Sequence, residues 1–368
     1  MNGQVSDIAG DLVFRPGTRD DDAELRRLNA EAFPANPKTR PEVTAWQWWD
    51  NPFGETIVHV WEQGERLVGQ YVAYRMPAQL GGEPGRVAIG VDYAIAPSHR
   101  GQGLGKPMLD ACFGQATAEG TPFYSLPNQL SVGGAIRSGL SIVAQLEVRV
   151  LPTDPAVIPE LLRDTGAVRR AGRFGSSAAS LAGALARPAV AALGRRTRLP
   201  AGIDVAVVDA VPDDVDALWE GVRHHHPWGV ARHGDWWRWR YAAHPDRPYR
   251  LVEARRSGRL VGLSAVVTRG DLGGRFHCLL ELLADEQDAA RAIVATVADP
   301  AFGDAHGVAC TAVPGSRLSH LAGAAGLRRI PPRVLPRPVY FGVVPCPGVV
   351  PEPTAVAWST AWGDLDHI

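Results

Sequence analysis

Two stretches of this 368-residue chain repeat one order of apolar and polar positions. In the first, Trp-Gln-Trp-Trp at 46–49 is followed by a polar turn, an apolar stretch and Gly-Glu-Arg-Leu-Val-Gly at 64–69. In the second, Trp-Arg-Trp at 237–239 leads through another apolar stretch to Gly-Arg-Leu-Val-Gly at 258–262. Each stretch predicts an aromatic helix followed by a β-hairpin with a polar turn before its second strand.

The repeat continues toward the end of each half. Pro127 precedes a Gly-Leu pair by twelve residues, and Pro314 precedes another by the same twelve. A duplicated unit of this kind constrains the whole architecture. We therefore expect a first domain over 1–150, an Ala- and Arg-rich connector over 151–200, a second domain over 201–345 and a tail over 346–368.

The strongest local pattern is a predicted strand that runs into a glycine-rich turn and then a helix. Residues 91–96 are mainly apolar, glycines follow at 101, 103 and 105, and an apolar segment begins at Pro107. Glycines let the main chain approach a ligand closely, so that N–H groups converge on an anion at the helix N-terminus. The spacing matches neither the dinucleotide G-x-G-x-x-G nor the P-loop, which needs Ser or Thr where this chain has Pro107. The turn predicts a phosphate site of another kind.

This turn resembles the acyl-CoA pyrophosphate loop of the GNAT superfamily of N-acetyltransferases. Its sequence Arg-Gly-Gln-Gly-Leu-Gly at 100–105 fits the pattern Arg/Gln-x-x-Gly-x-Gly/Ala. The surrounding predicted elements have the matching order: a strand at 12–15, an acidic helix start at 20–22, a hairpin around Gly64 and a strand at 123–126. The resemblance implies a mixed α/β fold of two GNAT-like units, each a central mixed, largely antiparallel sheet flanked by helices.

The resemblance also implies which residues bind acyl-CoA. The pantetheine arm would lie along the main chain near Ile95. The pyrophosphate would lie on the loop, and the expected ligands there are Arg100, Gly101, Gln102, Gly103, Leu104 and Gly105. Asn128 would lie beside the thioester, and Lys106 would either add charge to a phosphate or remain a solvated lysine.

The second copy lacks this loop. Where it should occur, residues 284–291 read Ala-Asp-Glu-Gln-Asp-Ala-Ala-Arg, with no glycine and with acidic side chains that would repel a pyrophosphate. The second half looks like a degenerate GNAT unit, as in tandem families such as mycothiol synthase and the enhanced-intracellular-survival acetyltransferases. We expect one acyl-CoA per chain and no metal.

Catalysis in the GNAT mechanism is direct attack of a primary amine on the thioester. The family commonly places a tyrosine on the helix after the fifth strand, but residues 131–139 contain none. Tyr124 and Ser131 are the nearest substitutes for this tyrosine. Asp92, on the predicted strand that runs into the glycine-rich turn, is a candidate base. The alternatives are a strand tyrosine for Tyr124 and, for Asp92, a carboxylate satisfied by its neighbours.

Aromatic residues offer a wall for the acceptor. Trp46, Trp49 and Tyr93 would line that pocket, although tryptophans at helical spacing also pack in cores. The tail carries two tryptophans and two acids after a proline-rich spacer, so we expect it to dock. In the enhanced-intracellular-survival family the terminal carboxylate reaches the catalytic site, which here would bring in Asp366 and Ile368. The alternative is a strap that closes the second domain.

Charge and composition limit the classes of partner and the cellular compartment that we expect for this chain. The chain has 38 Lys and Arg against 39 Asp and Glu, a net charge of -1, which argues against nucleic acid. Only Lys38 and Lys106 are lysines, which we attribute to genome composition. Four cysteines without paired spacing indicate reduced thiols in the cytoplasm, and no long apolar run indicates export or membrane insertion. The arginines of the connector predict a solvated segment or, alternatively, an arm for an anionic ligand or lipid surface.

These observations favour an acyl-CoA-dependent N-acyltransferase whose acceptor is a small amine, such as an amino sugar, a glycan intermediate or a natural-product amine. The alternative enzyme is a protein-lysine acetyltransferase. The alternative of another class is a non-catalytic acyl-CoA-binding sensor, which the missing tyrosine favours.

Overall fold

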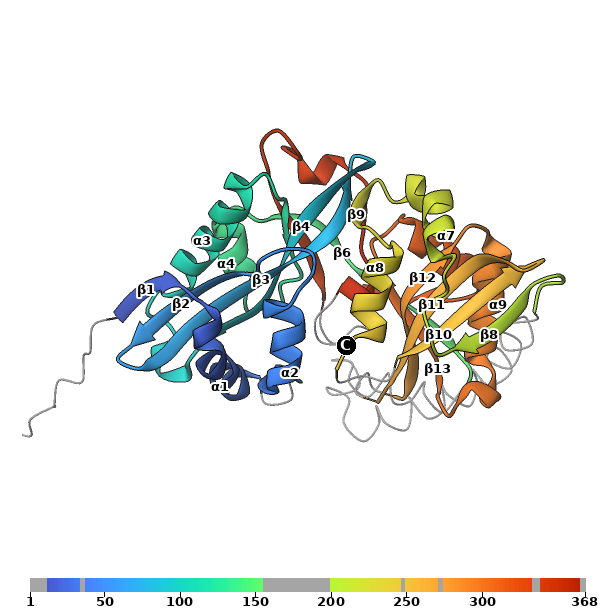
Figure 1. The fold of residues 1–368 in the computed structure, drawn as a ribbon, viewed down its shortest axis with the longest axis horizontal. Helices are drawn as coiled ribbons and strands as arrows, with labels where there is room; N and C mark the ends of the chain where they lie inside the picture. The colour runs from blue at the N-terminus through green and yellow to red at the C-terminus, as the bar shows by residue number, and fades with distance from the viewer. Residues whose placement is uncertain are drawn as a thin grey trace, which may run out of the picture. The chain divides into compact units, whose positions relative to one another are not determined.

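The computed structural model describes residues 12–33, 37–154, 199–245, 249–270, 274–332 and 338–364 (Figure 1). Its chain divides into two compact units. The first comprises Met1–Pro77, Arg86–Ser141 and Gly342–Pro353, and the second Ala78–Gly85, Ile142–Phe341 and Thr354–Ile368. The domain boundaries expected from the sequence stay predictions, and most of the expected connector, 155–198, lies outside the described residues.

A mixed sheet with strand order β1-β2-β3-β4-β5-β15-β6 runs through the first unit. The strands in this order are β1 (Leu12–Pro16), β2 (Ile57–Gln63), β3 (Arg66–Leu80), β4 (Glu83–Ile95), β5 (Phe123–Ser125), β15 (Tyr340–Val344) and β6 (Ser141–Gln145), and β9 (Trp228–Val230) and β16 (Trp358–Ser359) join the same sheet outside it. The helices are α1 (Asp22–Ala32), α2 (Pro41–Thr44), α3 (Gly105–Ala118) and α4 (Val132–Arg137). Strands β1, β2 and β3 pair antiparallel, whereas β4 and β5 are parallel because α3 crosses between them.

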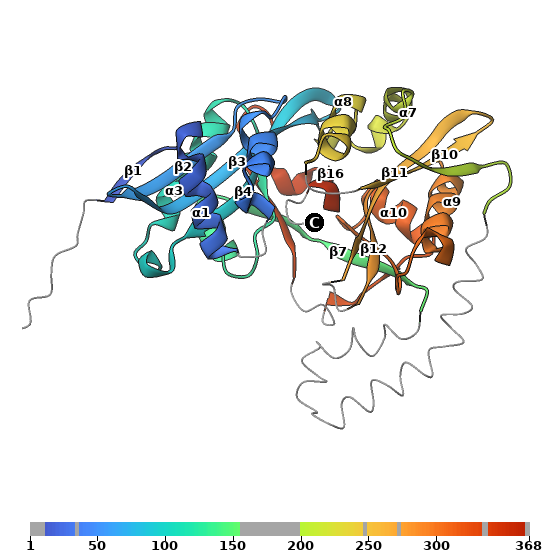
Figure 2. The ribbon, with the colours of Figure 1, turned by 60° about the horizontal axis from the view of Figure 1, so that its bottom comes forward.

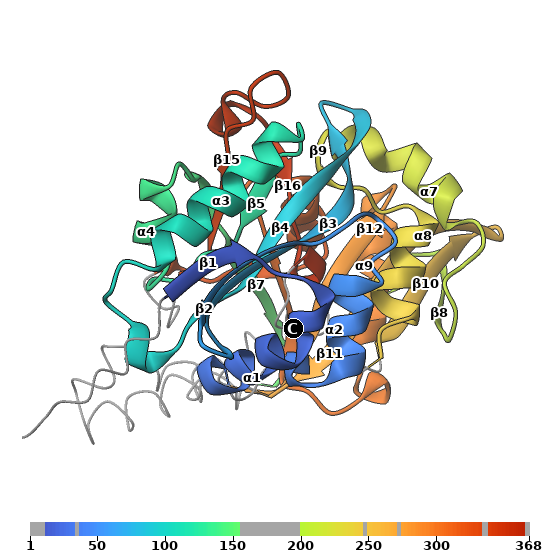
Figure 3. The same cartoon turned by 60° about the vertical axis from the view of Figure 1, so that its left-hand side comes forward.

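Helices α1 and α3 cover opposite faces of this sheet, and the alternation along β3 explains why. Val68 packs with Leu28 of α1. Its neighbour Gly69 faces the other way, where an added Cβ would lie 3.4 Å from Met108 of α3. Figure 3 shows α3 and α4 on one side of β3 and β4, and α1 and α2 on the other.

The second unit repeats this arrangement in a sheet of order β14-β7-β13-β12-β11-β10-β8. Its strands are β8 (Asp204–Val208), β10 (Arg250–Arg256), β11 (Arg259–Arg269), β12 (Phe276–Ala284), β13 (Gly307–Ala312), β14 (Arg328–Arg329) and β7 (Glu147–Pro152). The helices are α7 (Val215–Val222), α8 (Gly234–Trp237), α9 (Gln287–Ala298) and α10 (Arg317–Ala324). Helices α9 and α10 lie on one side of β11 and β12, and α7 and α8 on the other (Figure 2).

Matching details confirm that the two units share one fold. In each, a short α-helix runs into a π-helical turn, at Ala45–Trp49 after α2 and at Arg238–Ala242 after α8. In each unit, the N–H of the residue after the central strand donates to the carbonyl of a valine at the equivalent position of the preceding strand. Ala96 donates to Val68 at 2.8 Å, and Asp285 donates to Val261 at 3.1 Å. The expected mixed α/β fold with two largely antiparallel sheets is therefore confirmed.

At least one strand of each sheet comes from the other half of the sequence. Strand β7 follows β6 in the chain but pairs antiparallel with β13 of the second unit, Leu151 opposite Val308. Strand β15 comes late in the chain but pairs antiparallel with β5 of the first unit, Val343 opposite Tyr124. Each sheet thus depends on a distant segment for its completion.

Three further features bear on function. Across the described ranges, none of the helices has the length and apolar character needed to cross a membrane. The same ranges contain no cluster of His, Cys, Asp and Glu suited to holding a metal ion. The four cysteines are buried and free.

Candidate functional site

The parallel pairing of strands β4 and β5 in the first unit ends at Gly90. Their parallel ladder ends at the pair Gly90 and Ser125, but β4 continues to Ile95. The main chain of residues 91–95 therefore extends past the ladder, with its peptide groups available on the β5 side. A Cβ on Gly90 would overlap the hydroxyl of Tyr71, which bonds to Ser125. A larger residue than glycine at position 90 would displace the groups that mark the end of the ladder.

The glycine loop occupies the nine residues between β4 and α3. Gly101 and Gly103 adopt φ angles of +78° and +80°, which glycine tolerates far better than other residues. A Cβ on either would meet no atom within 4 Å, so the space above both is open. Gly105 is needed for another reason, because a Cβ there would overlap the Tyr93 hydroxyl.

The head of α3 presents unsatisfied donors. Leu104, at the N-cap, makes no side-chain cap, and no group in the described ranges accepts from the main-chain N–H groups of 101–105. Together with the helix dipole of a 14-residue helix, these donors favour an anion. The indole of Trp61 fixes the loop by donating to the Leu104 carbonyl at 2.8 Å.

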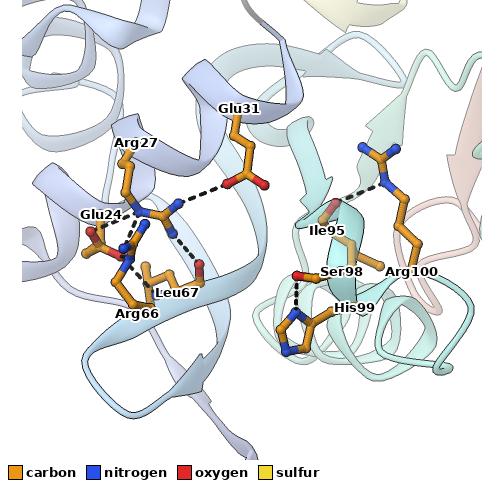
Figure 4. A network of polar contacts seen from close by, with 9 residues as sticks. All are labelled: Glu24, Arg27, Glu31, Arg66, Leu67, Ile95, Ser98, His99 and Arg100. Carbon is orange, nitrogen blue, oxygen red and sulfur yellow. Dashed lines mark hydrogen bonds and ion pairs between the residues drawn. The ribbon is translucent and has the colours of Figure 1, made fainter. Parts of the chain in front are cut away.

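Side chains of the loop fold back on its own main chain, as Figure 4 shows for Arg100, whose Nε donates to the Ile95 carbonyl at 3.2 Å. Gln102 Nε2 donates to the Ser98 carbonyl at 3.2 Å. Lys106 pairs with Asp110 at 2.5 Å, and its side chain is 61% exposed. The ammonium of Lys106 therefore already has a counter-ion one turn along α3.

Helix α1 is anchored to the other face of the sheet near the loop. Arg27 donates through Nη2 to the Leu67 carbonyl at 2.6 Å and also pairs with Glu24 and Glu31, each at 3.0 Å (Figure 4). Because Leu67 precedes Val68, the partner of Ala96, this contact ties α1 to the strand beside the end of β4.

Asp92 is buried and forms an ion pair with Lys38, whose side chain is 1% exposed. Its φ of +50° is unusual for a residue other than glycine and interrupts the extended run of β4. Lys38 Nζ also lies 5.8 Å from the centre of the Trp48 ring. The sequence analysis missed Lys38, although its being one of only two lysines was a signal.

Tyr93 projects on the opposite face to Lys38, with its ring edge-on to Tyr71 at 5.3 Å between centroids. Burial raises the pKa of its hydroxyl, which stays protonated at neutral pH. The structure thus places Tyr93 against Gly105 at the head of α3. Its expected contact with the acceptor stays a prediction.

Of the three remaining candidate residues of the first unit, Asn128 and Ser131 contact each other. Tyr124 is fully buried within β5, between β4 and β15. Asn128 caps the turn before α4: its Oδ1 accepts from the N–H of Leu130 at 2.8 Å and of Ser131 at 3.1 Å. The Ser131 hydroxyl lies 3.3 Å from the same oxygen. The catalytic roles assigned to Tyr124 and Ser131 stay predictions.

The tryptophans divide between packing and partial exposure. Trp48 is buried, whereas Trp46 and Trp49 are half-buried. Trp49 donates through its indole to Asp22 at 2.7 Å, which fixes the π-helical turn to α1. Trp46 and Trp49 therefore keep part of their surface available to a ligand.

The second unit has no equivalent of the glycine loop. Strand β12 ends at Ala284 and α9 begins at Gln287, so two acidic residues replace nine. Asp285 pairs with Arg259 at 2.9 Å and Glu286 with Arg256 at 2.8 Å. These carboxylates lie at the head of α9, where the first unit offers N–H donors.

Residues 354–364 of the C-terminal tail dock within the second unit, whereas 346–353 belong to the first. Trp358 is buried in β16 (Trp358–Ser359), which pairs parallel with β9 (Trp228–Val230). Asp364 is fully buried and pairs with Arg232 at 2.8 Å. Asp366 and Ile368, expected near the acceptor, lie outside the described residues.

Comparison with known proteins identifies one domain in the first half of the chain. Residues 13–128 match the acetyltransferase (GNAT) domain. No curated protein matches the sequence.

Solved structures match the fold over most of the chain. A probable N-acyltransferase from Enterococcus faecalis, described as a conserved protein of unknown function, aligns with a TM-score of 0.60 at 12% identity, over 94% of this chain and 74% of that one. Eis1 from Mycobacterium abscessus gives 0.53 at 13% identity, over 91% and 74%. A tandem GNAT protein from the clavulanic acid biosynthesis pathway gives 0.52 at 13% identity, over 90% and 98%.

Proposed function

We propose that this chain, which carries an acetyltransferase (GNAT) domain in its first unit, transfers an acyl group from acyl-CoA to the primary amine of a small molecule. The observation that carries the proposal is the set of N–H donors at the head of α3, reached through two positive-φ glycines beside the point where β4 leaves β5. A pyrophosphate fits those donors, and a pantetheine arm fits the exposed edge of β4.

The proposed acyl-CoA ligands are the residues of this region. Arg100, Gly101, Gln102, Gly103, Leu104 and Gly105 form the loop, Ile95 ends the strand, Lys106 opens the helix and Asn128 lies in the turn after β5. Binding requires Arg100 to leave the Ile95 carbonyl and Lys106 to share its charge with Asp110, and both side chains are exposed enough to do so. One acyl-CoA per chain is expected, because the second unit places acids where the loop would be.

The proposed reaction is direct acyl transfer. The amine nitrogen forms a bond to the thioester carbonyl carbon, the carbon–sulfur bond breaks, and the sulfur leaves as the thiolate of CoA. One proton passes from the amine to a base, and one reaches the thiolate. Asp92, Tyr124, Ser131 and the tail carboxylates of Asp366 and Ile368 are the predicted proton carriers, with Trp46, Trp49 and Tyr93 as predicted acceptor contacts.

A second candidate function is acyl-CoA binding without turnover. Helix α4, where the family commonly places its tyrosine, reads Val-Gly-Gly-Ala-Ile-Arg. Such a chain would bind acyl-CoA at the same loop and release no thiol.

Thiol release from acetyl-CoA distinguishes these functions. The assay uses amino sugars, small aliphatic and aryl amines, and a lysine peptide as acceptors, with calorimetric titration of acetyl-CoA in parallel. Amine-dependent thiol release supports the transferase, and the productive acceptor separates small-molecule from lysine transfer. Binding without release supports the sensor, and absence of binding contradicts both.

A further inference from the structure

Each unit buries an acid at the same position of its central strand. Asp92 lies four residues before Ala96, and Glu281 lies four before Asp285. Since Ala96 and Asp285 donate to the equivalent valines Val68 and Val261, the two acids are equivalent by register. The sequence repeat alone did not reveal this correspondence.

Each acid is held by a cation from the segment that precedes the tryptophan-rich helix. Lys38 pairs with Asp92 in the first unit. Arg232 pairs with Glu281 at 3.1 Å in the second. Each cation also lies over a tryptophan ring, Lys38 over Trp48 at 5.8 Å and Arg232 over Trp236 at 5.0 Å. The buried ion pair is thus a shared feature of the fold.

The main chain at the acid differs between the units. Asp92 adopts a φ of +50°, and Glu281 is not among the positive-φ residues of the described chain. In the second unit β12 remains in its ladder, with a register shift where Glu281 pairs with Ala265. The left-handed residue therefore occurs in the unit that also has the glycine loop.

The left-handed turn at Asp92 sets the direction of the next three residues. Tyr93 comes to lie with its hydroxyl against Gly105, and Ile95 presents its carbonyl to Arg100. Gln70 supports the turn, because its Nε2 bonds to Asn29 at 2.9 Å and approaches the Asp92 carbonyl at 3.4 Å. Side-chain contacts on the buried face thus determine the shape of the edge on the other side of β4.

We propose that Lys38 is a positioning residue for the acyl-CoA site. Its ammonium fixes the Asp92 carboxylate, which holds the left-handed main chain at that residue and so places Tyr93 and Ile95 at the head of α3. This inference rests on the proposed function for its ligand. It assigns Lys38 no contact with substrate and gives a role to a lysine that is buried against Asp92 of β4.

Buried ion pairs add little net stability but fix geometry in favourable cases. Removing both charges of the pair should therefore change the main-chain geometry at residue 92 without unfolding the protein. The variant Lys38→Met/Asp92→Asn removes both charges and keeps both side-chain volumes. Lys38→Met alone would leave the Asp92 charge buried and is used only if it folds. The matched control is Glu281→Gln, which removes the equivalent acid of the second unit and leaves Arg232 paired with Asp364.

Three quantities are measured on each full-length protein: the melting temperature, the dissociation constant for acetyl-CoA, and hydrogen exchange of a peptide spanning residues 92–96. We expect the double variant to melt near the wild-type temperature, to bind acetyl-CoA at least tenfold more weakly, and to exchange the 92–96 amides at least tenfold faster. Glu281→Gln should match the wild type in binding and in exchange at 92–96. Where turnover is found, kcat/KM should fall more than kcat.

A folded double variant with wild-type exchange at 92–96, or with acetyl-CoA affinity within twofold of the wild type, would overturn the proposal. A fall in kcat with unchanged affinity would also overturn it, because that result assigns Asp92 to proton transfer. If the wild type itself fails to bind acetyl-CoA, the proposed function is wrong, and the exchange measurement still decides whether Lys38 holds the turn.

Discussion

The Tyr93 hydroxyl occupies the position that a Cβ on Gly105 would take. Tyr93 ends the left-handed turn of β4 and Gly105 begins α3, so this single contact joins the strand edge and the helix head that the proposed function requires. Its geometry gives a test in which one substitution compensates another.

Gly105→Ala should destabilise the first unit by about 1–3 kcal/mol, because a methyl group is forced into an occupied space. Adding Tyr93→Phe should recover most of the loss, since the ring Cζ would then lie 3.1 Å from the new methyl carbon. Chemical denaturation of the two single variants and the double variant measures the coupling. Additive losses would show that the two residues do not interact in solution.

Gly103→Glu should raise the acetyl-CoA dissociation constant at least a hundredfold, because it brings a side chain and a negative charge to the phosphate position. Gly258→Glu is the matched control: both glycines have a φ near +80° with nothing within 4 Å of an added Cβ, and Gly258 belongs to the second unit. Calorimetry should find one site in the control and none in the variant. Two sites per chain in the wild type would contradict the assignment.

Glu281 should make the stability of the second unit depend on pH. Burial raises its pKa from the ordinary 4.5 to about 7, against the opposing effect of Arg232. Between these values the folded chain keeps a proton that the unfolded chain releases, so the contribution of Glu281 to the free energy of unfolding falls as pH rises from about 4.5 to 7.

Melting temperatures across this range, compared with those of Glu281→Gln, isolate that contribution. The comparison is needed because burial lowers the pKa of His226 to about 3, which acts in the opposite sense over an overlapping range in both proteins. A temperature difference between the two proteins that does not change with pH would show that Glu281 has an ordinary pKa.

The tail separates into a structural part and a part that the catalytic hypothesis needs. Asp364→Ala should destabilise the second unit by about 1–3 kcal/mol, because the buried Thr360 hydroxyl and Ala361 N–H would lose the carboxylate that accepts from them. Deleting residues 365–368 leaves these contacts intact. If the terminal carboxylate accepts the proton, this deletion should lower kcat at least a hundredfold with unchanged melting temperature and acetyl-CoA affinity. Unchanged kcat would remove Asp366 and Ile368 from catalysis.

Local patterns account for what the sequence could predict. The glycines at 101, 103 and 105 indicate positive φ angles and close approach over a few residues, and the acidic segment at 284–291 indicates their loss. The ion pair of Lys38 and Asp92 joins residues 54 apart, and alternation along β4 could not anticipate a left-handed residue that changes the direction of the strand. The spacing of the tryptophans at 46, 48 and 49 predicted a helix. It did not indicate that, of these three, only Trp48 would be buried.

Because β7 and β15 are exchanged between the two halves of the sequence, the first sheet can be completed only late in synthesis of the protein. When the ribosome has completed β5, the first sheet still has an open edge there, and the strand that covers it begins at Tyr340, more than 200 residues later. An uncovered edge invites pairing with other chains. The nascent first unit must therefore wait for nearly the whole chain, and a fragment ending at the close of the first half should aggregate where the full chain does not.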